Sequence, residues 1–343
     1  MDEASEAPGR GPRPLIVLHS LRPPDGTTKY VDQIVEGAPP DVDVRLFTWW
    51  TALFGRYDVL HVHWPELLVR DSRGIGARIL KRRLLAVLLL RLRLQRIPLV
   101  WTAHNLGPHE EGSAAEQRAL AKLSRRIDLV IRLNEASPAV GGEVWLIPHG
   151  HYRDAFAPHR KPEAEPGRVL YFGLIRPYKG VDQLIEAFEK LPRSDARLRI
   201  VGQPHPGQAE GVLEACARDP RISSTLRFVD DAELVDEICR AQLVVLPYRG
   251  FMHNSGSLLA GLSLGRPVLV PSSPTNEALA EEVGPGWVLQ HTGDLTPEVL
   301  EAALDSTVAL PDEPPRLDGR DWAWIGCRHR DAYLRALALR RGR

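Results

Sequence analysis

The segment Gly173-Leu174-Ile175-Arg176-Pro177-Tyr178-Lys179-Gly180 joins a predicted strand to a predicted helix. The run 168–172 before it is apolar and of strand length, and the run 181–188 after it has apolar residues at helical spacing. A strand, a short loop and a helix in this order form the repeating unit of a parallel α/β sheet. The rest of the chain shows the same alternation, so we expect this architecture throughout.

The loop itself carries two cations, Arg176 and Lys179, beside two glycines, Gly173 and Gly180. The N-terminus of a helix attracts anions through its unpaired N–H groups and its dipole. Two full positive charges strengthen that attraction, so the natural ligand is a phosphate or diphosphate. A solvated turn with two surface cations is the alternative that the residues alone leave open.

The composition is that of a soluble globular protein of two domains, because 343 residues exceed what one hydrophobic core usually serves. Lys plus Arg equals Asp plus Glu, 44 each, which argues against a nucleic-acid partner. The three cysteines are dispersed and favour a reducing compartment without a metal site. Neither a signal peptide nor an apolar run long enough to cross a bilayer is evident, so we expect a cytoplasmic protein.

Apolar runs of strand length alternate with helical patterns and predict two parallel sheets with helices on both faces. The predicted strands are Leu15–Leu18, Val42–Phe47, Val59–His63, Leu99–Thr102, Leu129–Leu133, Val169–Phe172, Leu198–Val201, Leu226–Val229, Leu243–Leu246 and Val268–Val270. The segment 158–167 is Pro-rich and charged and predicts a linker. Ligands of such sheets bind beyond the carboxyl ends of the strands, so we expect the site residues in the loops that follow them.

Two doubly wound domains, the second opening with the Arg176 and Lys179 loop, resemble the GT-B glycosyltransferases of family 4, which use nucleotide-diphosphate sugars. The resemblance rests on the segments 101–105, 147–150, 226–231, 241–247 and 265–268 and on the Trp-containing C-terminal run. It implies an α/β fold of two Rossmann-like domains facing a cleft, with a C-terminal helix that crosses back to the first domain. The implied parts are an acceptor-binding domain 1–157, a nucleotide-sugar-binding domain 158–319 and a returning helix 320–343.

The resemblance also implies a set of site residues. His104 resembles the family's active-site histidine, and Arg176 and Lys179 would stabilise the leaving diphosphate. The donor diphosphate is expected to meet Arg176, Lys179, Asn254, Ser255, Gly256 and Ser257, and the nucleobase to meet Phe228 and Val229. The acceptor is expected to meet Gly26, Thr27, His63, Glu66, Asn105, His109 and Glu110. His61 is expected to be structural and to point to the side of its strand opposite His63.

The chain departs from the family pattern at one place. Family members carry two glutamates about two helical turns apart before the Gly-x-Pro turn, and those positions fall near Met252 and Ala260. Neither residue is acidic. Instead, Ser255, Gly256 and Ser257 open an apolar helix, where hydroxyls and free N–H groups are expected to cradle a phosphate. A serine cap beside a glycine turn is the simpler interpretation.

The function that follows is transfer of a hexose from a GDP- or UDP-sugar to an acceptor hydroxyl. The acceptor would be a lipid-linked saccharide, a polysaccharide precursor or another glycoconjugate. The resemblance implies retention of the anomeric configuration and no metal or other cofactor, the nucleotide-sugar being a co-substrate. Two alternatives stay open, namely a sugar-nucleotide epimerase on the same scaffold and a non-catalytic nucleotide-sugar-binding partner subunit.

The run 78–96 is both basic and apolar, and no acidic residue occurs between Asp71 and Glu110. A basic amphipathic helix can lie on an anionic bilayer, which predicts peripheral contact with the inner membrane face. An ordinary crossover helix whose arginines extend around a buried leucine face explains the same pattern.

Overall fold

The computed structural model describes residues 13–23, 29–104, 112–137, 141–250 and 254–342. The chain divides into two compact units, each of which is described by itself. Unit 1 comprises the chain up to His149 together with Trp322 onward, and unit 2 runs from Gly150 to Asp321. This division lies between His149 and Gly150, earlier than the predicted boundary at 157/158.

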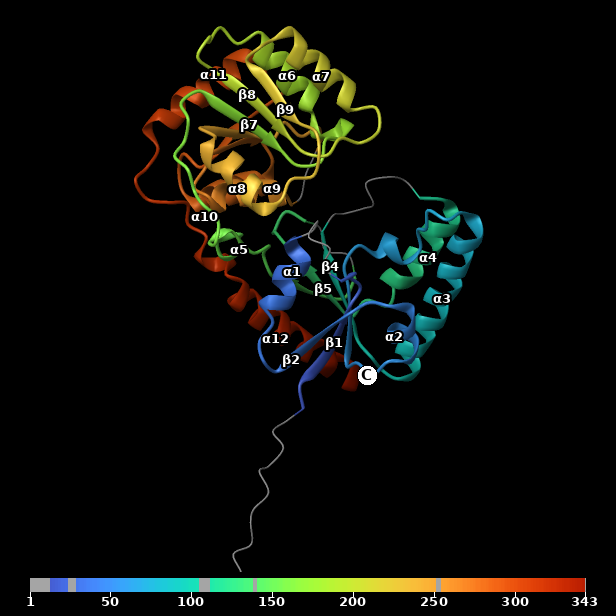
Figure 1. Ribbon diagram of the computed structural model, residues 1–343. Coiled ribbons are helices and arrows are strands. Elements are labelled where there is room, and N and C mark those ends of the chain that lie inside the picture. The colour runs from blue at the N-terminus through green and yellow to red at the C-terminus, as the bar shows by residue number, and fades with distance from the viewer. Residues whose placement is uncertain (1–12, 24–28, 105–111, 138–140, 251–253, 343) are drawn as a thin grey trace, which may run out of the picture. The chain divides into compact units, whose positions relative to one another are not determined.

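Unit 1 is a six-stranded parallel sheet in the order β2-β1-β3-β4-β5-β6 (Figure 1). Its elements are β1 (Leu15–His19), α1 (Lys29–Glu36), β2 (Val42–Leu46), α2 (Trp49–Phe54), β3 (Val59–Val62), the 3₁₀ helix η1 (Pro65–Leu68), α3 (Ile75–Leu94), β4 (Leu99–Ala103), α4 (Ala114–Ser124), β5 (Leu129–Arg132), β6 (Glu143–Leu146) and α12 (Trp322–Arg341). The chain leaves β1 to one side to form β2 and returns to the other side as β3. The topological switch point therefore lies between β1 and β3, where ligands of such sheets bind.

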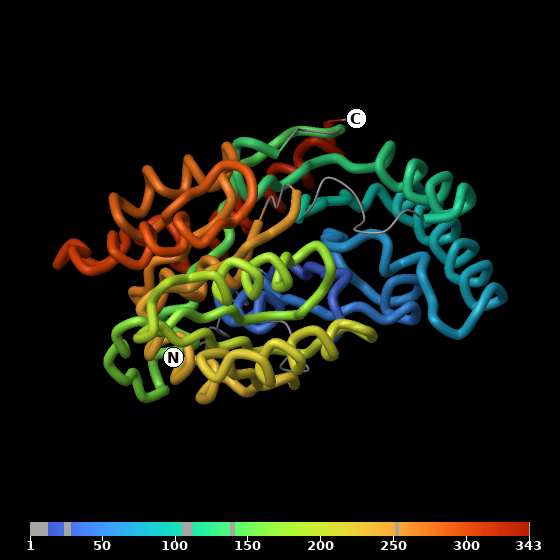
Figure 2. Tube along the Cα trace, turned by 90° about the horizontal axis from the view of Figure 1, so that it is seen from above, coloured from blue at the N-terminus to red at the C-terminus, as the bar shows by residue number. Residues whose placement is uncertain are grey.

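The two faces of this sheet carry two separate cores, because successive strand residues point in opposite directions. Val17 and Val59 pack with α1 and α12, whereas their neighbours Leu18 and Leu60 pack with α2, α3 and α4. Helix α12 thus shares one layer of unit 1 with α1 although it is the last element of the chain. Figure 2 shows its red end beside the green segment of β6, where Arg335 forms an ion pair with Glu143.

Unit 2 is a second six-stranded parallel sheet, in the order β12-β11-β10-β7-β8-β9, around one continuous core. Its elements are α5 (Arg153–Phe156), β7 (Arg168–Phe172), η2 (Pro177–Lys179), α6 (Val181–Glu189), β8 (Arg197–Val201), α7 (Ala209–Arg218), β9 (Ile222–Thr225), α8 (Asp231–Arg240), β10 (Leu243–Val245), α9 (Gly256–Ser263), β11 (Val268–Pro271), α10 (Pro274–Val283), β12 (Val288–His291), α11 (Pro297–Ser306), η3 (Thr307–Ala309) and η4 (Asp318–Arg320). Here the switch point lies between β7 and β10. Two parallel sheets with the predicted α/β alternation confirm the fold class.

The strand predictions fail only at sheet edges. Strand β9 spans Ile222–Thr225, whereas the predicted strand 226–229 is irregular chain and Phe228 is half exposed. Strands β6 and β12 have no counterpart among the predicted strands. All three are edge strands, which pack against a neighbour on one side only and therefore tolerate polar residues that interrupt the apolar pattern.

Candidate functional site

The loops after β7 and β10 flank the switch point of unit 2, and close backbone contacts fix both of them. A Cβ on Gly202, which follows β8, would lie 1.8 Å from the carbonyl oxygen of Gly173. A Cβ on Gly180 would lie 1.9 Å from the carbonyl oxygen of Pro247, and Gly180 has φ +67°. Only glycine fits such approaches. The predicted phosphate loop is therefore held tightly to its neighbours.

Lys179 is connected to the N-terminus of α9 through an aromatic ring. Its Nζ lies 4.0 Å from the centre of the Tyr248 ring, and the Tyr248 hydroxyl lies 2.8 Å from Oγ of Ser255. Ser255 caps α9 by accepting a hydrogen bond from the N–H of Leu258. The cation and the positive end of the helix are thus joined in one arrangement, as an anion site requires.

The two cations of the loop have no carboxylate partner among the described residues. Arg176 is half-buried and forms no ion pair there, and the Lys179 ammonium lies over the rings of Tyr178 and Tyr248. A Cβ on Gly173 would lie 3.2 Å from Oγ of Ser257, so the loop faces the first turn of α9. Burying charge without a partner is costly, which favours an anionic ligand at this place. These residues were expected to share one site, and the structure brings the loop and the first turn of α9 together.

The residues predicted to contact the nucleobase make fewer contacts that point to a ligand than the residues of the Arg176 and Lys179 loop do. Phe228 is exposed, and its carbonyl oxygen accepts a hydrogen bond from Arg227 at 3.1 Å. Val229 packs against the core of unit 2. Asn254 is half-buried directly before the Ser255 cap. No contact in the structure assigns a base to these residues, so their role stays a prediction.

Unit 1 contains a chain of buried hydrogen bonds that starts at His104, the residue after β4. Nε2 of His104 lies 3.1 Å from Nδ1 of His63, and Nε2 of His63 lies 3.0 Å from Nδ1 of His19. Nε2 of His19 lies 3.2 Å from the hydroxyl of Tyr333, which lies 2.8 Å from Nδ1 of His61. The chain ends at Thr102, whose Oγ1 lies 2.7 Å from Nε2 of His61. It connects three strands and α12.

Burial keeps these imidazoles neutral. Desolvation lowers the pKa of His19 and of His104 to about 3, and it lowers the pKa of His61 and His63 well below the ordinary value. Neighbouring histidines act in the same direction because two adjacent positive charges repel. A neutral imidazole donates at one nitrogen and accepts at the other, which suits a chain of hydrogen bonds.

The ring nitrogens of His19, His61 and His63 lie close enough together to suggest a metal site. However, both nitrogens of each ring already take part in the hydrogen bonds described above. A metal ion would have to replace several of them. The geometry therefore favours a hydrogen-bonded core.

A cavity of about 980 Å³ lies at the switch point of unit 1, beyond the carboxyl ends of β1, β2 and β3. Its walls include Arg22 and Trp64 from the loops after β1 and β3, Trp49 at the start of α2, and residues from the beginning of α3. The volume is at the upper end of the range for small-molecule sites. A saccharide of more than one ring would fit.

Comparison with known proteins identifies the family. The family model "Glycosyl transferases group 1" matches residues 166–307. A protein of Xanthomonas campestris pv. campestris (strain ATCC 33913) named GDP-mannose:glycolipid 4-beta-D-mannosyltransferase is 43% identical over 328 residues, which cover 95% of this chain and 93% of the relative. A second protein of that name is 42% identical over the same coverage. The chain belongs to the GT-B glycosyltransferases of group 1.

The solved structures agree with this assignment at the level of the fold. Anabaena Alr3699/HepE, determined in complex with UDP, matches this glycosyltransferase with a TM-score of 0.61 at 16% identity, covering 96% of this chain and 98% of the other. The 43% identical relative confirms the prediction of a hexosyltransferase, and the solved structure confirms the GT-B scaffold.

The structure bears on the predicted roles of two histidines of the glycosyltransferase, His63 and His61. His63 is fully buried and both its ring nitrogens are bonded, so the structure speaks against direct contact with an acceptor. His61 shares the side of the strand with His63, their ring centres being 4.2 Å apart, which corrects the expectation of opposite sides. The reason is that side chains two apart on a strand point the same way. His61 does face a helix, through Tyr333.

The roles of the other predicted acceptor residues stay predictions. Glu66 is half-buried in η1, directly after β3. Gly26, Thr27, Asn105, His109 and Glu110 lie outside the described residues. The tryptophans and arginines of the unit 1 cavity were not predicted as site residues, although Thr48-Trp49-Trp50 directly follows the second predicted strand and was a usable signal.

Proposed function

We propose that this glycosyltransferase transfers a mannosyl group from GDP-mannose to a hydroxyl of a lipid-linked saccharide. The observation that carries the proposal is the 43% identity, along nearly the whole chain, to a protein named GDP-mannose:glycolipid 4-beta-D-mannosyltransferase. The charge arrangement in unit 2 supports a nucleoside diphosphate as the donor, since no described carboxylate of this unit pairs with Arg176 or Lys179.

In the proposed reaction, the acceptor oxygen attacks the anomeric carbon of the donor. The bond between this carbon and the diphosphate oxygen breaks, and its electrons leave with the diphosphate. Arg176, Lys179 and the N-terminus of α9 stabilise the growing negative charge, which can contribute several kcal/mol to the rate. Fixed cations at this point make metal-independent transfer the proposed mode, and unchanged turnover in excess EDTA is the expected result.

We further propose that the reaction inverts the anomeric centre. The sugar of GDP-mannose is α-linked, and the relatives are named for a β product. Retention, which the resemblance implies, would give an α-mannoside instead. NMR of the product distinguishes the two through the coupling between C1 and H1, and an α-mannoside would overturn the proposal.

Inversion needs a group that takes the proton of the acceptor hydroxyl. Glu66 is the proposed base, because it follows β3 at the switch point and forms no ion pair among the described residues. His104 stays neutral and is proposed to hydrogen-bond the donor sugar. Glu66→Gln is expected to lower kcat at least about 100-fold. The matched control is Glu36→Gln, an exposed glutamate at the end of α1.

The first test of the proposal is donor selectivity. Thermal unfolding is followed with GDP, UDP, ADP and CDP, because a ligand that binds the folded state raises Tm. GDP alone is expected to raise Tm, and this stabilisation should be lost in Lys179→Ala. A selective response to UDP would overturn the assignment of GDP-mannose while leaving a glycosyltransferase.

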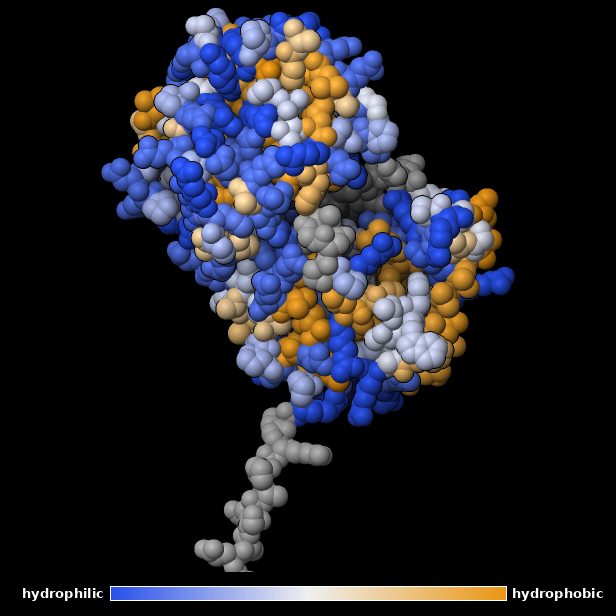
Figure 3. All heavy atoms as spheres, in the orientation of Figure 1, coloured by the Kyte–Doolittle hydropathy of each residue, from blue (hydrophilic) through white to orange (hydrophobic). Residues whose placement is uncertain are grey.

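We propose that unit 1 contacts the inner face of an anionic membrane peripherally. Helix α3 exposes Ile75, Val87, Leu90 and Leu94, and Figure 3 shows such hydrophobic side chains between hydrophilic ones on the side of unit 1 that carries α3. Exposed arginines of α3 alternate with them. In the described part of the chain, no helix has the length and apolarity needed to cross a bilayer. Contact at the surface is consistent with both observations.

Sedimentation with vesicles tests this contact. Binding to vesicles that contain anionic phospholipid is expected, with little binding to neutral vesicles and loss at high salt. Leu90→Glu with Leu94→Glu should abolish it, whereas Leu213→Glu, an exposed leucine of α7 in unit 2, should not. Equal effects of both changes would contradict the assignment to α3.

A further inference from the structure

The first residue of α9 is a glycine, Gly256, that its backbone conformation does not require. Its φ lies outside the left-handed region, so other residues could adopt the same conformation. Glycine also weakens a helix relative to alanine, so its presence here needs another reason. Among the described residues, a Cβ on Gly256 would meet Tyr152 alone, with the hydroxyl oxygen 2.9 Å away. The close approach of this hydroxyl is the reason that the structure offers.

Tyr152 is held along α9 at both ends of its side chain. Its backbone N–H donates a hydrogen bond of 2.9 Å to Oγ of Ser263, the last residue of α9, and its hydroxyl lies beside Gly256, the first. The Tyr152 ring stacks on the Phe156 ring, with centres 5.5 Å apart and planes 18° from parallel. Only 7% of the residue is exposed. The position of the hydroxyl is therefore set by the fold before any ligand binds.

The first turn of α9 lies between two groups that distant parts of unit 2 bring to it. The loop after β7 approaches at Ser257, since a Cβ on Gly173 would lie 3.2 Å from Oγ of Ser257. Tyr152 approaches at the preceding residue, Gly256. A helix leaves its first N–H groups without partners in the helix, and both of these residues belong to the first turn. A phosphate at this point would meet N–H donors from the helix and an O–H donor beside them.

The Tyr152 hydroxyl keeps its proton over the whole physiological range. Burial raises the pKa of Tyr152 far above its ordinary value, because the phenolate would lose its hydration. A protonated hydroxyl can donate a hydrogen bond to an anion, whereas a phenolate would repel it. Hydrogen bonds to a charged group are roughly twice as strong as those between neutral groups.

We propose that Tyr152 is a further catalytic residue of this glycosyltransferase, whose hydroxyl donates a hydrogen bond to the diphosphate at the N-terminus of α9. The contact strengthens as negative charge grows on the leaving diphosphate, so it acts on the rate as well as on binding. Gly256 leaves the room that this hydroxyl occupies. The inference rests on the proposed function for the presence of a diphosphate at α9, and it does not depend on the base or the sugar of the donor.

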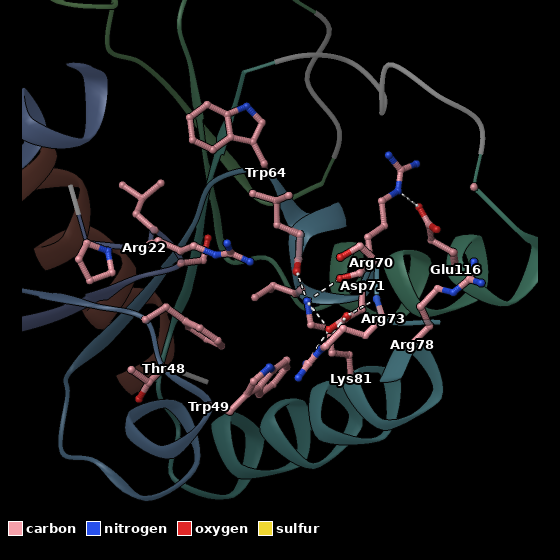
Figure 4. Close-up of a pocket in the computed structure, with 18 of the residues that line it drawn as sticks. Arg22, Thr48, Trp49, Trp64, Arg70, Asp71, Arg73, Arg78, Lys81 and Glu116 are labelled. Atoms are coloured by element: carbon pink, nitrogen blue, oxygen red, sulfur yellow. Dashed lines mark hydrogen bonds and ion pairs between the residues drawn. The ribbon is translucent and has the colours of Figure 1, made fainter. Parts of the chain in front are cut away.

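Inorganic diphosphate is the probe, because it carries no base and an error about GDP does not affect the result. Its affinity is measured by calorimetry for the wild-type protein, for Tyr152→Phe and for two controls. Tyr57→Phe removes a buried hydroxyl of unit 1 that donates to the Ala52 carbonyl. Arg22→Ala removes a cation from the wall of the unit 1 cavity, where Figure 4 shows it, and thereby reports any diphosphate bound there instead. Binding of GDP and turnover are recorded separately.

Tyr152→Phe is expected to bind inorganic diphosphate about tenfold or more weakly than the wild-type protein and to lose at least as much in kcat. Both controls should change the affinity for diphosphate by no more than about twofold. Unchanged affinity and kcat in Tyr152→Phe would overturn the inference, as would a wild-type protein that binds no diphosphate. An equal loss in either control would do the same. Binding of diphosphate without binding of GDP would overturn the proposed donor alone.

Gly256→Ala tests the other partner of the contact. In the wild-type background the new Cβ displaces the Tyr152 hydroxyl, so both Tm and the affinity for diphosphate should fall. In the Tyr152→Phe background the nearest described atom is the ring carbon Cζ, 3.9 Å from the new Cβ, which is an ordinary contact. There, Gly256→Ala should leave Tm unchanged or raise it, because alanine favours the helix. Equal shifts of Tm in the two backgrounds would contradict the close approach and with it the inference.

Discussion

Nε2 of His104 lies 3.1 Å from Nδ1 of His63, so only one of these two facing nitrogens carries a proton. Because both rings are neutral, this choice fixes the tautomer of His63 and then of each further member of the chain. If His104 donates, the direction continues through His19, Tyr333 and His61 to Thr102. If Thr102 donates, every proton is reversed. The tautomer that His104 presents is therefore coupled to groups deep in unit 1.

Replacing Tyr333 should show how much the chain of hydrogen bonds from His104 to Thr102 contributes to the stability of the protein. The Tyr333 hydroxyl bridges His19 and His61, and Tyr333→Phe leaves two buried nitrogens unpaired. A loss of about 2–6 kcal/mol in the free energy of unfolding is expected, since each of the two unsatisfied buried groups costs about 1–3 kcal/mol. Urea unfolding measures it. In the control Tyr57→Phe, the Ala52 carbonyl keeps its bond from Arg91, so about 1 kcal/mol is expected. Equal losses in Tyr333→Phe and Tyr57→Phe would mean that bridging two histidines adds nothing to the contribution of the Tyr333 hydroxyl.

Stability should fall steeply in mild acid. Burial lowers the folded-state pKa of His19 and His104 to about 3 and that of His329 to about 4. The unfolded chain takes up protons at these rings below about pH 6.5. The stabilising contribution is therefore complete above pH 6.5 and is lost as the pH falls, by about 1.4 kcal/mol per pH unit for each such histidine. Tm between pH 8 and 5 measures the loss.

His329→Leu is the variant that assigns this effect. The His329 ring is buried, and its Nε2 has no hydrogen-bond partner among the described residues. Removing this ring should reduce the slope of the unfolding free energy against pH by about 1.4 kcal/mol per pH unit between pH 6 and 5. The exposed His205 serves as control, and His205→Ala should leave the slope unchanged. An unchanged slope in His329→Leu would refute the assignment.

Lys179→Ala should reduce turnover far more than stability. Nζ of Lys179 contacts the Tyr248 ring and faces the start of α9, where the diphosphate is proposed to bind. Loss of one electrostatic donor typically lowers kcat about 100- to 1,000-fold. The folded state loses the cation–π contacts of Lys179 with Tyr178 and Tyr248, worth about 1–2 kcal/mol together. Lys190→Ala, which removes an exposed pair with Glu186, should leave kcat unaltered. Near-normal turnover of Lys179→Ala would dismiss the proposed role.

Gly180→Ala tests whether the phosphate loop depends on close packing. The new Cβ would lie 1.9 Å from the carbonyl oxygen of Pro247, in addition to the strain at φ +67°. A loss above about 3 kcal/mol is expected from strain and overlap together. Gly207→Ala shares the positive φ, +81°, but nothing lies within 4 Å of its Cβ, so about 1 kcal/mol is expected. The difference in unfolding free energy between Gly180→Ala and Gly207→Ala measures the cost of the overlap with Pro247. Similar losses in the two variants would show that this cost is negligible.

The central strands and the position of the Arg176 and Lys179 loop between a strand and a helix could be predicted from sequence because each depends on local pattern. Buried parallel strands are apolar on both faces, and the strand, loop and helix order places Arg176 and Lys179 at a helix N-terminus without further information. The edge strands β6, β9 and β12 could not be predicted in the same way. Their position at the edge, which relaxes the pattern, is set by the order of the sheet.

The sequence by itself determined the α/β class and the order of strand, loop and helix that carries Arg176 and Lys179, since both follow from periodicity, and its short motifs resembled those of the family. Only the tertiary structure decided that Lys179 reaches the Ser255 cap through Tyr248 and that His63 lies inside a hydrogen-bonded chain. It also decided that Arg22 and Arg78 share a cavity with Trp49 and Trp64. These residues lie on different strands and helices, and the sheet order that brings strand ends together arises from packing between distant segments, which no local pattern encodes.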